Sequence, residues 1–127
     1  RNVFQRHPER AYQRELNRIL WFVSSARKAV TKLPIHTMVA GDRYAHGEAK
    51  LREQGVGIVN GSVVPPPPWA SKWHRLSFSK IAALSLVQFR KVIVVDNDMA
   101  LIHNVDELAG VPAPAAVFHA AMGPVAR

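Results

Sequence analysis

The sequence predicts an α/β domain built on a mostly parallel sheet flanked by helices. Short apolar runs typical of strands alternate with longer stretches whose apolar residues follow helical spacing. Strands that alternate with helices form parallel βαβ units. The apolar run 92–95 is too short for a helix and rich in Val and Ile, so it fits a strand buried on both faces. A length of 127 residues corresponds to one domain at most, residues 1–127.

In the first half of the chain, two helices are each followed by a strand. A helix is predicted over residues 11–29, before Pro34, and a strand over 35–40. An amphipathic helix over 43–54 ends at a glycine, and a strand over 56–59 follows. The first helix is expected to bury an apolar stripe of Leu16, Ile19, Leu20, Val23 and Val30.

The second half is predicted to contain one more helix and the strand 91–95. The proline run 65–68 cannot donate backbone hydrogen bonds, which favours an extended polyproline II segment. Trp69 and Trp73 are expected to pack around this run. Ser77 or Ser79 can cap the next helix, because a serine hydroxyl accepts from the free amides of a helix start.

Two carboxylates, Asp96 and Asp98, follow the predicted strand 91–95. In an extended segment they point to the same side, at the strand end where α/β proteins bind ligands. Carboxylate oxygens suit Mg²⁺ or Mn²⁺, which in turn hold phosphate oxygens. Aspartate and asparagine are also favoured in turns, so a structural alternative exists. However, residues 54–95 contain no acid, so these carboxylates cluster at the end of the strand, whereas surface carboxylates would normally be scattered. The sequence therefore predicts a metal-diphosphate site here.

The segment 96–108, DNDMALIHNVDEL, closely resembles the signature of glycosyltransferase family 8, the glycogenin-like enzymes. Residues 79–91 are similar to the family's lysine-bearing helix. The resemblance implies a GT-A, Rossmann-like domain that binds a UDP-sugar, with Asp96 and Asp98 as Mn²⁺ (or Mg²⁺) ligands. Lys80 would lie beside the nucleotide or donor sugar, and the backbone of Asn97 would face the ribose. The implied reaction is Mn²⁺-dependent sugar transfer to a glycan or protein hydroxyl with retention of anomeric configuration.

The resemblance also implies a partial domain, incomplete at both ends. The family's first strand, and a C-terminal half that supplies a histidine as third metal ligand, have no counterpart in the sequence. No catalytic residue is predicted, and residues 1–127 alone are expected to be inactive. Tyr12 is the candidate for a uracil-stacking aromatic. Asp106 and Glu107 are interpreted as structural, capping a short helix.

Other functions remain open or are disfavoured. A net charge of +8 is spread along the chain without a basic run, so no nucleic-acid partner is expected. No apolar run is long enough to span a membrane, and the absence of cysteine excludes thiolate metal sites. The compartment is undetermined: cytoplasm if glycogenin-like, Golgi if a targeting segment exists. The alternatives are another metal-dependent nucleotidyl or sugar-phosphate transferase of the same fold, and an inactive fragment or binding module.

Overall fold

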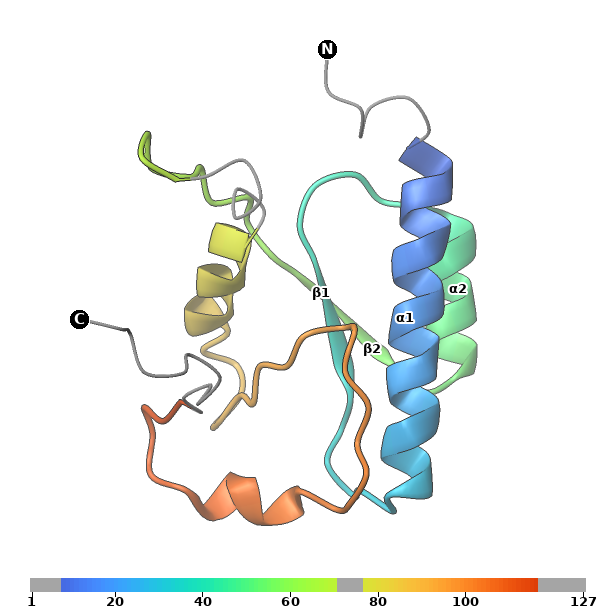
Figure 1. Cartoon of the computed structure of the whole chain (residues 1–127), viewed down its shortest axis with the longest axis vertical. Helices are drawn as coiled ribbons and strands as arrows, with labels where there is room; N and C mark the ends of the chain where they lie inside the picture. Colours follow the sequence, from blue (N-terminus) through green and yellow to red (C-terminus); the bar gives the residue numbers. More distant parts are fainter. Residues whose placement is uncertain (1–7, 71–76, 117–127) are drawn as a thin grey trace, which may run out of the picture.

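The computed structural model describes residues 8–70 and 77–116. The elements in chain order are the helix α1 (Pro8–Lys28), the strand β1 (His36–Val39), the helix α2 (Ala45–Glu53), the strand β2 (Gly57–Asn60), and the 3-10 helices η3 (Ser77–Ser85) and η4 (Asp106–Gly110). In Figure 1, α1 and α2 lie together on one side of the strands and η3 lies on the other. Within the described ranges, no helix has the length and apolar character needed to cross a membrane.

The predicted parallel pairing is confirmed for β1 and β2. The two strands are hydrogen-bonded neighbours in register from the pair His36 and Gly57 to the pair Val39 and Asn60. The helix α2 connects them, which makes a βαβ unit. Both strands therefore end at the same edge of the sheet, where the loops after Val39 and Asn60 begin.

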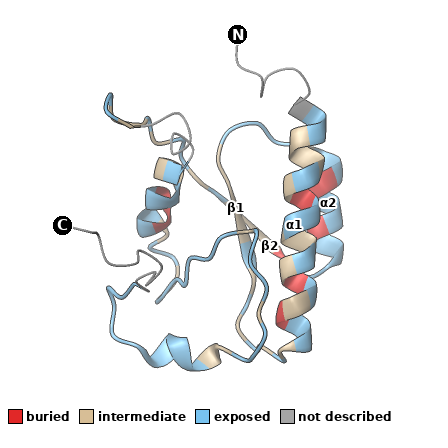
Figure 2. Cartoon of the chain, viewed as in Figure 1, coloured by how far each residue is buried: buried red, intermediate tan, exposed pale blue. Residues whose placement is uncertain are grey.

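A small core lies between the helices and β2. Leu16 and Val23 of α1 are each only 2% exposed, and they cluster with Leu51 of α2 and with Val56, just before β2. Figure 2 shows the buried residues concentrated on α1 and α2. The predicted stripe is thus confirmed at Leu16 and Val23, and Ile19 and Leu20 pack against the same cluster while remaining partly exposed.

Val30 does not belong to this stripe, so that part of the prediction was wrong. Its side chain is 68% exposed, and its φ of 57° lies in the left-handed region. The Val30 amide donates to the Arg27 carbonyl (3.0 Å) and the Thr31 amide to the Ala26 carbonyl (3.2 Å). This pair of bonds is the Schellman motif that ends many helices, usually with glycine at the left-handed position. The chain therefore turns away before Val30 can reach the core.

The helix predicted after residue 77 forms as the 3-10 helix η3, with Ala82 and Ala83 buried. Ser79 does not cap it; its hydroxyl accepts from the Val64 amide at 3.3 Å and so connects η3 to the segment before the prolines. Trp69 is 81% exposed and lies edge-on to Phe78, with ring centroids 5.9 Å apart. Trp73 lies outside the described residues.

The buried strand predicted over residues 91–95 is not formed. In the described part of the chain the sheet has two strands, β1 and β2, and the run 92–95 pairs with neither. Its side chains are 37–53% exposed. An apolar strand needs hydrogen-bonding neighbours along its edges and cover on both faces. The described residues provide neither, so the run has strand composition without strand structure.

Candidate functional site

The four residues predicted to bind metal and nucleotide come together at one groove. This groove, of about 620 Å³, is bounded by α1, by β1 and by the segment from the run 92–95 to residue 98. Its lining includes the four predicted residues, which are Lys80, Asp96, Asn97 and Asp98. Residues 97 and 98 form a turn rather than extended backbone, so the alternation expected of a strand does not apply to Asp96 and Asp98.

Lys80 and Asp96 contact each other directly across this groove. The Lys80 ammonium of η3 donates to Asp96 Oδ1, and the two side chains are 51% and 50% exposed. Solvent screens an ion pair this exposed, so its contribution to stability is small. The pair shows that the Lys80 ammonium and the Asp96 carboxylate meet at the groove wall.

Asn97 is held from a different element. Its side-chain amide donates to Glu15 Oε2 of α1 at 2.9 Å. Glu15 also accepts from Arg14 Nε at 3.0 Å and from Arg18 Nη1 at 3.2 Å. Partial burial acts to raise the pKa of Glu15, but the bond from Asn97 and the two arginines hold it below its usual value. Sequence reasoning missed this contact, which joins residues 82 positions apart.

Asp96 and Asp98 are the acidic side chains that line this groove in the part of the chain that the structure describes. In residues 8–70 and 77–116, no three His, Asp or Glu side chains converge on a point where they could hold a metal ion. His36 instead lies edge-on to Phe89, with ring centroids 4.9 Å apart. The role of Asp96 and Asp98 as metal ligands stays a prediction, in which they would supply two of the oxygens that a hard cation needs.

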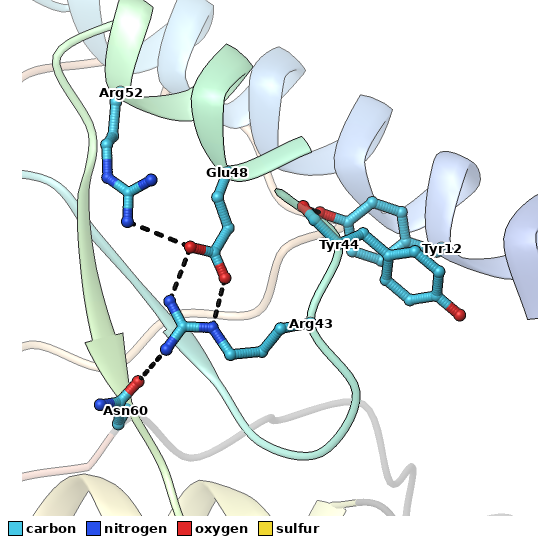
Figure 3. A network of polar contacts seen from close by, with 6 residues as sticks. All are labelled: Tyr12, Arg43, Tyr44, Glu48, Arg52 and Asn60. Atoms are coloured by element: carbon cyan, nitrogen blue, oxygen red, sulfur yellow. Dashed lines mark hydrogen bonds and ion pairs between the residues drawn. The ribbon is translucent and has the colours of Figure 1, made fainter. Parts of the chain in front are cut away.

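The loops at the carboxyl ends of β1 and β2 are joined by a polar network that sequence reasoning also missed (Figure 3). Its centre is Glu48 of α2, only 6% exposed. Arg43 donates to both Glu48 oxygens (2.5 and 2.6 Å) and to Asn60 Oδ1 (2.6 Å), and Arg52 donates to Glu48 at 3.0 Å. The hydrogen bond from Arg43 lowers the pKa of Glu48. Only the i,i+4 spacing of Glu48 and Arg52 was visible in the sequence.

Tyr12, the candidate for uracil stacking, packs beside this network and is not part of the groove lining. Its ring centroid lies 4.2 Å from that of Tyr44 and 5.7 Å from that of His46. Burial raises the pKa of Tyr12, and the Glu48 carboxylate adds to this effect. Gly47 leaves room for the Tyr12 ring, since a Cβ there would come within 2.0 Å of the Tyr12 hydroxyl. The uracil-stacking role stays a prediction.

Asp106 has a structural role, but in a different place from the one predicted. It does not cap η4 with its side chain. Its carboxylate accepts from the Thr31 hydroxyl and from the Lys32 amide (2.8 Å) in the loop after α1. The bond from Thr31 is the main cause that lowers the pKa of Asp106. Asp106 therefore fastens the segment after the groove to the end of α1.

The sequence is similar to part of two curated proteins of Arabidopsis thaliana. It is 28% identical over 98 residues to galactinol synthase 3 and 26% identical over 98 residues to galactinol synthase 2. Each match covers 74% of this chain and 29% of the relative, so the chain spans less than a third of their length. No family model matches the chain. No solved structure matches it at a significant level.

Proposed function

We propose that this chain is part of the nucleotide-sugar-binding region of a glycosyltransferase that transfers a sugar from a UDP-sugar to an acceptor hydroxyl. Both relatives are galactinol synthases, which supports a glycosyltransferase, and the signature over residues 96–108 resembles that of family 8. Both likenesses support the proposed class of enzyme. Because the relatives are named for the synthesis of galactinol, a UDP-linked galactose is the first donor to test.

The observation that carries the proposal is the meeting of Lys80 with Asp96 on a wall that also contains Asp98. Lys80 comes from η3 and the aspartates from the turn after the run 92–95, so a basic and an acidic element face one groove. The ion pair supports this proposal, because it places positive charge beside the Asp96 carboxylate at the groove. Hard carboxylate oxygens fit Mn²⁺ or Mg²⁺.

Each residue then has a role in holding the donor. Asp96 and Asp98 would hold the divalent cation, which when bound supplies positive charge to the diphosphate leaving group. Lys80 would supply a further positive charge to the phosphate oxygens through a charge-assisted hydrogen bond. The turn at Asn97 would place the two carboxylates beside the donor. Retention of configuration is part of the proposal because the resemblance to family 8 implies it.

Calorimetric titration of the full-length protein with Mn²⁺ and UDP tests the metal site. Asp98→Asn should remove most of the Mn²⁺-dependent UDP binding, since an amide is a much weaker ligand for a hard cation. Asp42→Asn is the matched control, because Asp42 is an exposed aspartate outside the groove. Equal affinity in the wild type and Asp98→Asn would overturn the assignment. No binding to the wild type would favour an inactive relative.

The lysine has its own test in donor kinetics. Lys80→Ala should weaken use of the donor by about 1–3 kcal/mol, the range for a hydrogen bond to a charged group. The control is Lys50→Ala on α2, where Lys50 is exposed. A surface change of that kind is expected to stay within about 0.5 kcal/mol. If Lys80→Ala behaves like Lys50→Ala, then Lys80 does not contact the donor.

A further inference from the structure

The turn that carries Asp96 and Asp98 has little structural support of its own. The run 92–95 before it belongs to no strand and is 37–53% exposed. Met99, just after it, is 49% exposed. Neither β-ladder bonds nor a packed core therefore fix the position of the two carboxylates. Contacts from neighbouring elements must do so.

The helix α1 provides such contacts along much of its length. Asn97 donates to Glu15 Oε2 at 2.9 Å, and the Leu101 amide donates to Ser25 Oγ at 2.9 Å. Further along, the side-chain amide of Asn104 donates to the Val30 carbonyl, just beyond α1, at 2.8 Å. The core residues Leu16 and Val23 fix α1 itself. A segment without regular structure is thus attached to a helix that the core holds in place.

Glu15 differs from Ser25 and Val30 because its hydrogen-bond partner, Asn97, lies in the turn itself. Its neighbour Leu16 is 2% exposed, which fixes the backbone at this position. Arg14 and Arg18 hold the Glu15 carboxylate from the solvent side, and the side chain is 36% exposed. Asp96 is bound by Lys80 from η3, whereas Asn97 is bound by Glu15 from α1. Adjacent residues of the turn are therefore held by two different elements.

We infer that Glu15 is a positioning residue, which acts through Asn97 to set the orientation of Asp96 and Asp98 at the groove. The inference rests on the proposed function, because it concerns the same metal-diphosphate site. Glu15 does not contact the bound group in this role. It restricts the turn, so that less conformational freedom is lost when both carboxylates engage one cation.

The test measures Mn²⁺-dependent UDP affinity and thermal stability of the full-length protein for Glu15→Ala, Glu15→Gln, Asn97→Ala and the double change Glu15→Ala with Asn97→Ala. Glu15→Ala and Asn97→Ala should each weaken UDP binding about three- to tenfold. The double variant should bind UDP no more weakly than each single variant does, as expected for residues that act as one pair. Glu15→Gln should stay within about twofold of the wild type, because the amide oxygen can still accept from Asn97 although the ion pairs with Arg14 and Arg18 are lost.

The glutamine variant separates positioning from simple stabilisation of the helix. If Glu15 mattered only through its arginine pairs, Glu15→Gln and Glu15→Ala would weaken binding equally, and the inference would be wrong. Glu9→Ala removes an exposed glutamate from the first turn of the same helix and serves as the control. Loss of binding in Asp98→Asn with none in Glu15→Ala would overturn this inference alone. Absence of binding in the wild type would overturn the proposed function and the inference with it.

Discussion

Residues 77–116 have a more apolar sequence than residues 8–60, yet the two regions are stabilised in different ways. The first region forms two α-helices and a pair of parallel strands around Leu16, Val23, Leu51 and Val56. In the second region, Ala82 and Ala83 are the buried hydrophobic residues among those described, while Leu84, Val87 and Ile102 are 85–88% exposed. Figure 2 shows the same contrast, with buried residues mainly on α1 and α2.

The difference shows what each kind of element needs. A helix forms its backbone hydrogen bonds within itself, whereas a strand depends on a neighbour. The strand β1 has β2 beside it because α2 returns the chain in parallel. The run 92–95 has a stronger strand composition than β1 but no partner among the described residues. Polar contacts to α1 position the second region instead, which makes it dependent on the first.

The largest difference between the two regions is expected when side-chain volume is removed from each of them. Leu16→Ala should destabilise the fold by about 2–5 kcal/mol, because it leaves a cavity in the core where Leu16 is 2% exposed. Val94→Ala, at a position 53% exposed, should cost less than about 1 kcal/mol. Urea unfolding of both variants measures the difference. Similar losses in the two variants would mean that the second region has a core of its own.

The next largest effect concerns two carboxylates with lowered pKa values, Glu48 in the first region and Asp106 in the second. A carboxylate whose folded pKa is depressed contributes stability above its unfolded pKa, and that contribution is lost as the pH falls through the folded value. Glu48→Gln should therefore lower the melting temperature by several degrees at pH 7. Below pH 4.5, the usual pKa of glutamate, the melting temperature of this variant should depend less on pH than that of the wild type. Thermal unfolding between pH 7 and pH 3 measures both effects.

Asp106→Ala is the counterpart of that variant in the second region, because alanine removes both oxygens that accept from Thr31 and Lys32. Asp106 fastens the second region to the loop after α1, so its loss should release that region without unfolding α1 and α2. Faster hydrogen exchange confined to residues 97–110, with little change in melting temperature, is the expected result. Faster exchange throughout residues 8–60 would show that the two regions unfold together.

A smaller effect is expected at Val30, where the two regions meet. Val30 has a φ of 57°, a conformation that is costly for a β-branched residue and that glycine adopts freely. Val30→Gly should therefore stabilise the fold by about 1 kcal/mol, measured by urea unfolding. Val63→Gly is the control, because Val63 is also exposed (61%) but has no positive φ. Equal effects of the two glycines would mean that Val30 carries no strain.

The smallest effect is expected for an exposed ion pair on α1. Arg18 donates to Glu15 at 3.2 Å, but the two side chains are 43% and 36% exposed, so solvent screens the pair. Arg18→Ala should change the free energy of unfolding by less than about 0.5 kcal/mol. A larger loss would mean that Arg18 stabilises the attachment of Asn97 through Glu15, and that the first region supports the second more strongly than the single contacts indicate.

The helices and strands of the first region were predicted from the sequence, apart from the place of Val30. Helical spacing of Leu16 and Val23 located α1, and the glycine after α2 located its end, because these signals act within a few residues of the chain. Asp96, Asp98 and Lys80 were also predicted to belong to one site, and all three line one groove. The metal and nucleotide roles of these residues were predicted from chemistry and resemblance, and they remain to be tested.

Long-range contacts set which apolar runs become strands and which polar residues meet. The run 92–95 had the composition of a buried strand, but pairing depends on a neighbour that no local signal specifies. The bond between Glu15 and Asn97 joins positions 82 residues apart, and the turn that presents Asp96 and Asp98 depends on it in our interpretation. Residue type therefore set the chemistry available to this protein, whereas long-range contacts set where that chemistry lies, because contacts between distant residues leave no periodic pattern in the sequence.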